Sequence, residues 1–176
     1  MYSLDFNNKV VLDVGAFVGD TAVFFASKGA RKIVAYEPVP YHVKFIQMNA
    51  ELNGVNIELH DEGMGDTNEN KTIFYDTFGM DFGWKQGSNQ LEIKTRNAQQ
   101  VINDSNADMA KIDCKGAEES LLQVPNETLR KIPQYIIEVH SLTIREQIIA
   151  KFESAGFLTE RNFSPFDYHY PMKKTQ

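Results

Sequence analysis

The chain has 176 residues and a mass of 20.0 kDa, which fits one domain over residues 1–176 that needs no disulfide or structural metal. Its 18 basic and 24 acidic residues give a net charge of −6, which argues against nucleic-acid binding. The single cysteine excludes an intramolecular disulfide and a multi-cysteine metal site. The sequence has no membrane-spanning apolar run and no signal-peptide pattern, so it predicts a soluble, cytoplasmic protein.

Short apolar runs alternate with amphipathic segments over the first third of the chain. Three runs rich in β-branched residues predict strands buried on both faces, as in a parallel sheet, at 10–14, 32–36 and 56–60. Helical patterns at 20–28 and 43–52 separate these strands. The alternation predicts a doubly wound α/β sheet with right-handed crossovers.

This rhythm breaks between residues 61 and 97. Two strand-like runs, at 72–75 and 91–94, predict an inserted β-hairpin around 72–95 with a long irregular segment between its arms. Further strands and helices are then expected in turn at 109–113, 117–124, 135–140 and 144–155, with a closing pair of strands at 157–162 and 168–172. The sequence therefore predicts three layers around a sheet of about seven mostly parallel strands.

The first strand–loop–helix junction reads Leu12-Asp13-Val14-Gly15-Ala16-Phe17-Val18-Gly19-Asp20-Thr21. Open α/β sheets bind ligands at such junctions, beyond the carboxyl ends of the strands. A dinucleotide fingerprint needs a glycine where this chain has Phe17, and the carboxylates of Asp13 and Asp20 suit a cationic amino group better than a diphosphate. The loop therefore favours S-adenosylmethionine over NAD, and a nucleotide-dependent oxidoreductase is the less favoured alternative.

The second strand ends in Tyr36-Glu37-Pro38-Val39-Pro40. A carboxylate at this position can accept hydrogen bonds from both hydroxyls of a ribose. Glu37 follows Gly19 by 18 residues, near the separation of about 20 that nucleotide-binding sheets show. The prolines stiffen the turn, so that Val39 could lie against a base. The alternative is a surface glutamate at a strand end.

On these motifs the chain resembles the FkbM-type S-adenosylmethionine-dependent methyltransferases from about residue 10 to 157. The resemblance also rests on Lys111-Ile112-Asp113-Cys114-Lys115-Gly116-Ala117-Glu118 and on Ile137-Glu138-Val139-His140. It implies a Rossmann-like class I methyltransferase fold of seven strands with an antiparallel last strand, and O-methylation of a small-molecule or sugar hydroxyl. The cofactor-binding residues that the resemblance and the loop together suggest are Asp13, Gly15, Ala16, Phe17, Gly19, Asp20, Thr21, Glu37, Pro38, Val39, Glu62, Gly63, Met64 and Asp113.

Two residues depart from the family pattern. Phe17 replaces a usual asparagine, which removes a polar contact, and Lys115 replaces an acid, which reverses a charge near the expected acceptor site. A cofactor-binding homologue with lost or altered catalysis is therefore an alternative. Only about nine residues precede the first strand, so an N-terminal acceptor-binding extension is expected to be missing.

Methylation of an alcohol needs a general base, and three candidates lie at strand ends: Asp113, Glu138 and His140. His140 titrates near neutrality when unperturbed, although it could equally cap its strand, and Asp113 suits an orienting role better. Glu118 either favours a helix dipole or has a functional role. No metal site is expected, because the sequence has no helical ligand pair or tight acidic cluster.

The remaining expectations concern partners and single side chains. The expected acceptor is a small molecule or sugar, selected by residues 77–90 and 163–167. Phe82 and Trp84 could form a lid over this acceptor or pack into a small satellite core. An RNA methyltransferase is a further alternative, which the net charge of −6 disfavours. No membrane contact is expected, and a homodimer could cover the active edge of the sheet. Cys114 should be a buried structural thiol, whereas surface or loop positions are expected for His42, His60 and His169.

Overall fold

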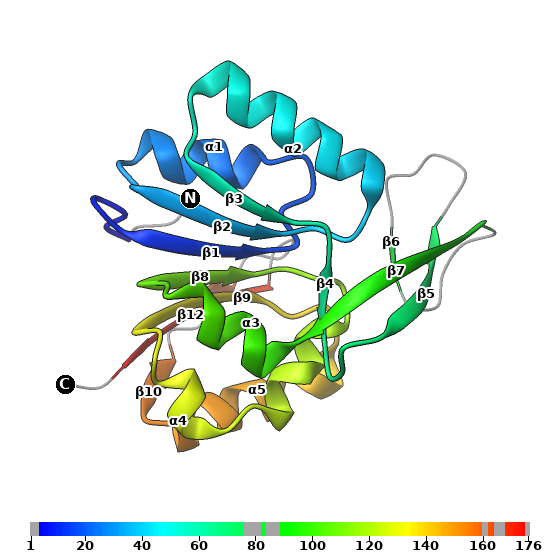
Figure 1. Ribbon diagram of the computed structural model, residues 1–176. Helices are drawn as coiled ribbons and strands as arrows, with labels where there is room; N and C mark the ends of the chain where they lie inside the picture. The colour runs from blue at the N-terminus through cyan, green and yellow to red at the C-terminus, as the bar shows by residue number, and fades with distance from the viewer. Residues whose placement is uncertain (1–3, 76–81, 84–88, 160–161, 164–167, 175–176) are drawn as a thin grey trace.

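A computed structural model describes residues 4–75, 82–83, 89–159, 162–163 and 168–174 (Figure 1). The central sheet follows the order β10-β12-β9-β8-β1-β2-β3, with β11 paired to β12. Its strands are β1 (Val10–Val14), β2 (Lys32–Tyr36), β3 (Ile57–His60), β8 (Met109–Ile112), β9 (Gln134–Glu138), β10 (Phe157–Thr159), β11 (Asn162–Phe163) and β12 (Tyr168–Lys174). Strands β1, β2, β3, β8 and β9 run parallel, while β12 is antiparallel to both neighbours. This confirms the predicted doubly wound sheet and its antiparallel last strand.

Helices cover both faces of this sheet (Figure 1). One face carries α1 (Asp20–Ser27) and α2 (Pro40–Asn53), and the other carries α3 (Ala98–Ser105), α4 (Asn126–Leu129) and α5 (Leu142–Ser154). No described helix combines the length and apolar character that crossing a membrane requires.

Strand β1 shows why its sequence lacks polar alternation. All five of its residues are buried. Leu12 and Val14 pack into the hydrophobic cluster between the sheet and helices α3 and α5. Val11 packs into the cluster on the other face, between the sheet and helices α1 and α2. Successive side chains of a strand point to opposite faces, so a strand between two helical layers needs apolar residues at nearly every position.

The register of the sheet gathers the chemistry at one edge. Val14 pairs with Tyr36 of β2 on one side and with Ile112 of β8 on the other. The residues that follow these three positions, Gly15, Glu37 and Asp113, therefore leave the sheet side by side. The order of the strands also reverses at β1: β2 and β3 are added on one side of it, whereas β8 and β9 are added on the other side. Such a switch point is where open α/β sheets bind ligands.

The predicted hairpin is present, and its arms are longer than expected. β5 (Asn70–Tyr75) pairs antiparallel with β7 (Asn89–Asn97), and β6 (Phe82–Gly83) extends this second sheet. The short strand β4 (Gly63–Gly65) pairs with β7 and joins the hairpin to the body of the protein. The side chain of Phe82 and all of Trp84 lie outside the described residues, as does most of 77–90 and 163–167, so the predicted lid stays a prediction.

Two local predictions need correction, and one helix was not predicted. The segment expected as an α-helix at 117–124 is a 3-10 helix, Ala117–Gln123, which begins after Gly116 with a φ of 100°. Helix α2 begins at Pro40 rather than at residue 43, because proline suits the first turn of a helix. Helix α3 was not expected, although Asn97 caps it by accepting a hydrogen bond from the backbone N–H of Gln99.

Candidate active site

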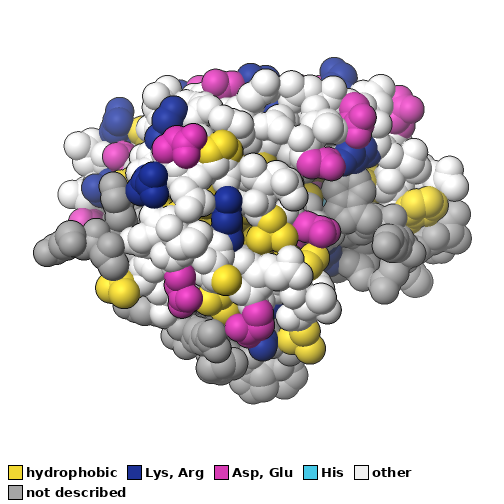
Figure 2. Space-filling model, turned by 90° about the horizontal axis from the view of Figure 1, so that it is seen from below, with side chains coloured by type: hydrophobic (Ala, Val, Ile, Leu, Met, Phe, Trp, Pro, Cys, Tyr) yellow, Lys and Arg dark blue, Asp and Glu magenta, His cyan; other side chains and the backbone are white. Residues whose placement is uncertain are grey.

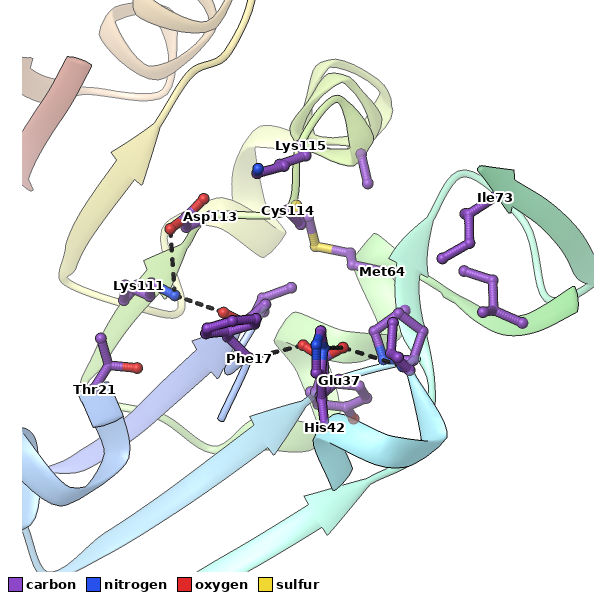
Figure 3. A pocket seen from close by; sticks show the side chains of 18 of the residues that line it. Phe17, Thr21, Glu37, His42, Met64, Ile73, Lys111, Asp113, Cys114 and Lys115 are labelled. Atoms are coloured by element: carbon purple, nitrogen blue, oxygen red, sulfur yellow. Dashed lines mark hydrogen bonds and ion pairs between the residues drawn. The ribbon is translucent and has the colours of Figure 1, made fainter. Parts of the chain in front are cut away.

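A cavity of about 320 Å³ opens at the carboxyl ends of β1, β2 and β8 (Figure 3). Its size and mixed lining suit a small ligand or cofactor. Ten of the fourteen residues predicted to bind a cofactor line it: Gly15, Phe17, Asp20, Thr21, Glu37, Pro38, Val39, Gly63, Met64 and Asp113. The other four, which do not line it, are Asp13, Ala16, Gly19 and Glu62. Lining residues that the sequence did not single out for this role include Val14, Tyr36, His42, Ile73, Ile93 and Lys111.

Gly15 lines the cavity next to the end of β8. Its φ is 75°, and a Cβ built on it would lie 1.8 Å from the backbone oxygen of Asp113. The backbone N–H groups of Gly15 and Ala16 both donate to the carbonyl oxygen of Tyr36, at 2.9 and 3.2 Å. The loop is thereby tied to both neighbouring strands, and only glycine fits at its first position.

Glu37 is buried at the end of β2 and its carboxylate is held by neighbours. Oε2 accepts from the backbone N–H of Phe17 at 2.9 Å, while Oε1 accepts from Val39 N at 3.1 Å and lies 3.1 Å from His42 Nδ1. A carboxylate has about four acceptor positions, so Oε2 keeps capacity for one hydroxyl. The Phe17 backbone thus supplies a polar contact in the loop even though its side chain does not.

His42 is a correction to the sequence prediction. It is buried rather than at the surface, because the early start of α2 places it on the inner side of the helix with Ile46 and Ala50. His169 lies in β12 and not in a loop. His60 fits the prediction better: it is partly exposed and stacks on Tyr36 with ring centroids 4.4 Å apart.

Asp13 lies beneath the loop rather than in the cavity, and it is wholly buried. Its Oδ2 accepts from Thr21 Oγ1 at 2.5 Å, and Lys111 Nζ lies 3.2 Å from Oδ1. The same ammonium donates to the carbonyl oxygen of Gly15 at 2.8 Å and lies 3.8 Å from Asp113 Oδ2 (Figure 3). The negative charge of Asp13 is therefore balanced by the protein's own cation, while Asp20 remains at the cavity wall.

The opposite end of the cavity is apolar. Val39, Ile73 and Ile93 form a small buried cluster, to which the hairpin strands β5 and β7 contribute the two isoleucines. Glu62 does not line the cavity, and its Oε2 lies 3.7 Å from Arg96 Nη1. The hairpin therefore supplies an apolar wall that would suit a flat base. The sequence predicted the hairpin but not its contribution to the cavity.

His140 lies beside Asp113 and close to two further carboxylates, Glu118 and Glu138. His140 Nε2 is 3.4 Å from Asp113 Oδ1 and 3.5 Å from Glu138 Oε1, and its Nδ1 is 3.3 Å from Glu118 Oε1. All three predicted catalytic residues are thus brought together, although only Asp113 lines the cavity itself. Burial disfavours the imidazolium, yet Glu118 and the two other carboxylates outweigh it and raise the pKa of His140 above 6.5.

Glu118 lies in the first turn of the 3-10 helix, as expected, and it also contacts His140. It is wholly buried, and its two oxygens accept from the backbone N–H groups of His140 at 2.9 Å and Gly116 at 2.5 Å. Burial alone would raise the pKa of Glu118, but the hydrogen bonds from His140 hold it below its ordinary value. Glu118 therefore fixes His140 from behind, with Nδ1 toward Glu118 and Nε2 toward Asp113.

The donor atoms of Asp113, Glu138 and His140 lie within 4.8 Å of one another, so the three residues could hold a divalent cation. The same distances are explained by ion pairs between a protonated histidine and two carboxylates. The prediction that no metal binds here stays a prediction.

Two non-glycine residues of the cavity wall have left-handed backbone conformations, Phe17 with a φ of 50° and Lys115 with a φ of 36°. Such strained residues cluster at functional sites. Cys114, between Asp113 and Lys115, packs against the main core and also lines the cavity. Burial raises the pKa of its thiol well above the ordinary value, which keeps it protonated and unreactive.

Comparison with known proteins decides the family. The methyltransferase FkbM domain matches residues 13–159, which is most of the chain. The chain belongs to the FkbM methyltransferase family. A segment of 61 residues is also 41% identical to a putative protein N5-glutamine methyltransferase of Methanocaldococcus jannaschii, covering 35% of this chain and 31% of that protein.

Solved structures of other methyltransferases share the fold of this FkbM-family chain. A precorrin-6y C5,15-methyltransferase from Geobacter metallireducens has a TM-score of 0.61 and 15% identity, covering 98% of this chain and 82% of that one. The ribosomal protein L11 methylase of Lactobacillus delbrueckii has a TM-score of 0.59 and 14% identity, covering 97% and 72%. TrmK of M. capricolum, determined with S-adenosyl-homocysteine, has a TM-score of 0.57 and 14% identity, covering 97% and 65%.

Proposed function

We propose that this methyltransferase takes its methyl group from S-adenosylmethionine and transfers it to an oxygen of a small molecule or sugar. The observation that carries the proposal is the pairing of the Gly15 loop with the buried carboxylate of Glu37 at one sheet edge. A bound S-adenosyl-homocysteine in one fold neighbour supports the choice of cofactor. The acidic net charge of −6 favours a small acceptor over a nucleic acid.

The lining of the cavity fits the three parts of this cofactor. Asp20 and Thr21 would face its amino-acid end beside Gly15, and Glu37 Oε2 would accept a ribose hydroxyl. Val39, Ile73 and Ile93 would enclose the base. When bound, the cofactor supplies an electrophilic methyl group on a sulfonium. The contribution of the protein is then to align the acceptor and to hold its proton.

His140 is the proposed general base. With Nδ1 bonded to Glu118, the neutral ring presents Nε2 as the acceptor atom toward Asp113, which lines the cavity. Nε2 takes the proton of the acceptor hydroxyl as the new oxygen–carbon bond forms and the sulfur–carbon bond breaks. Asp113 lines the cavity and lies beside this nitrogen, so it orients the acceptor and stabilises the imidazolium.

The proposed base predicts how the rate depends on pH. His140 must be neutral to accept a proton, and its pKa is raised above 6.5 by the surrounding carboxylates. We therefore expect the rate to rise with pH through an inflection above 6.5, and Glu118→Gln to lower that inflection because it removes a negative charge next to Nδ1. NMR titration of His140 gives the same comparison without an acceptor. An unchanged His140 pKa in Glu118→Gln would refute the positioning role of Glu118.

The acceptor class is tested with methyl-labelled S-adenosylmethionine offered, in separate reactions, to small sugars and alcohols, to RNA, and to glutamine-containing protein. Label is expected in the small-molecule fraction, and His140→Gln should lower its rate by a factor of about 10² to 10⁴. Label in RNA or protein would refute the acceptor class. Activity that is abolished by a chelator and restored by a divalent cation would instead make Asp113, Glu138 and His140 metal ligands and refute the role of His140 as a base.

A further inference from the structure

Helix α2 carries hydrophobic side chains on its outer side as well as its inner side. Tyr41, Phe45, Met48 and Leu52 follow one another at spacings of four, three and four residues and form one stripe along the helix. All four are exposed, Met48 by 55% and Leu52 by 79%. His42, Ile46 and Ala50 meanwhile bury the inner side. The outer stripe is therefore not needed for the core.

The stripe is the main apolar feature of the described surface. Seven large hydrophobic side chains are exposed among the described residues, and besides the four of the stripe they comprise Phe17, Leu142 and Leu158. The rings of Phe17 and Tyr41 both contact the ring of the buried His42, with centroids 4.6 and 4.5 Å apart, so Phe17 lies near the first residue of the stripe. On the face opposite α2, hydrophobic side chains stand singly among acidic and basic ones (Figure 2).

The spacing and the flanking charges indicate what covers this stripe. Apolar residues at alternating spacings of four and three form the contact line, or seam, between the helices of a two-helix coiled coil. On one flank of the seam stand Lys44 and Glu51, seven residues apart and both exposed. When two copies of α2 pack antiparallel, Tyr41 faces Leu52 and Phe45 faces Met48 of the other copy. Lys44 of each copy then faces Glu51 of the other, so the surface is complementary to itself under a two-fold axis.

We propose that two copies of this chain associate through their α2 helices in this antiparallel register. Helix α2 has 14 residues, which corresponds to about 21 Å of helix. Contact through this element alone is smaller than a standard interface, so the dimer is expected to be reversible and to depend on concentration. The register also brings Leu52 of the second copy to Tyr41, at the end of α2 that borders the cavity.

Sedimentation velocity from about 10 µM to about 1 mM tests the association. We expect the mass to rise with concentration from 20.0 kDa toward twice that value. Met48→Lys places a charge in the seam and should weaken the dimer about tenfold or more. Leu142→Lys, at another exposed leucine, serves as the matched control and should change nothing. A monomer at every concentration, or equal effects of the two variants, would overturn the proposal.

A charge swap tests the register. Lys44→Glu turns both intermolecular pairs into repulsive ones and should weaken the dimer about tenfold, whereas Lys44→Glu with Glu51→Lys should restore it. Neither change threatens the fold, since both residues are exposed and the swapped charges suit the helix dipole better. Unchanged thermal unfolding at low concentration checks this. If the double variant dimerises as weakly as the single variant, the antiparallel pairing is contradicted. Only a pairing of Lys44 with Glu51 of the other copy predicts that exchanging the two charges restores the affinity.

Discussion

Gly15→Ala is expected to lower the free energy of unfolding by at least about 3 kcal/mol and to abolish cofactor binding. The added Cβ would lie 1.8 Å from the backbone oxygen of Asp113, so β1 and β8 would have to separate at the edge where the cavity opens. Asp113 directly follows β8, and its backbone N–H donates to the carbonyl oxygen of Val14 in β1, so its own carbonyl group has little room to move aside. Urea unfolding measures the loss of stability, and calorimetric titration with S-adenosylhomocysteine measures the loss of binding.

Gly54→Ala is the matched control for this variant. Gly54 also has a left-handed backbone, with a φ of 65°, but a Cβ on it would meet no atom within 4 Å. We expect it to cost only the conformational penalty of about 1 kcal/mol and to leave ligand binding unchanged. Equal losses of stability in the two variants would show that position 15 requires glycine because of its backbone conformation, and not because of its close approach to Asp113.

Lys111→Met is expected to destabilise the protein by about 3–5 kcal/mol, because it leaves the wholly buried carboxylate of Asp13 without its cation. Asp13→Asn combined with Lys111→Met should recover much of this loss, since the amide oxygen of the introduced asparagine would still accept the hydrogen bond from Thr21 and no charge would remain buried. Urea unfolding of the wild type, both single variants and the double variant gives the coupling. Additive effects would contradict a direct ion pair.

This ion pair also has a consequence for the cofactor. Lys111 Nζ occupies the space between Asp13, Asp113 and the carbonyl oxygen of Gly15. The ammonium group of the cofactor is therefore expected to meet Asp20, at the wall of the cavity, rather than Asp13. For Asp20→Asn, we expect the loss of binding free energy for S-adenosylhomocysteine, measured by calorimetry, to exceed the loss in the free energy of unfolding. A larger loss of stability than of binding would indicate that Asp13, and not Asp20, binds the ammonium group.

The sheet was predictable because its signals are local. Strands β1 and β2 are short runs of mostly apolar residues, and they are followed by Gly15 and Glu37, whose chemistry is specific to this edge. Helix α3 was missed although Ala98, Val101 and Ile102 have helical spacing, because the segment has only eight residues and directly follows a strand that runs longer than expected. A helical period is hard to recognise over two turns.

The functional residues that the sequence misjudged depend on distant partners. Lys111 lies within a buried strand, which should have indicated a buried acid nearby, since lysines are rarely buried without a partner. Glu118 and His140 are 22 residues apart and meet only when β9 follows the 3-10 helix. The walls from Ile73 and Ile93 could not be predicted, because the folding of the hairpin over the cavity has no local pattern.

The most direct test of the proposed function is thermal unfolding with S-adenosylhomocysteine, compared with NAD and with buffer alone. A ligand that binds only the folded state, present at 100 times its Kd, adds about 2.7 kcal/mol and should raise the Tm by roughly 6–11 °C. We expect this rise with S-adenosylhomocysteine only, and its loss in Glu37→Ala, which removes the proposed ribose acceptor. A rise with NAD instead, or an undiminished rise in Glu37→Ala, would contradict the account of this cavity.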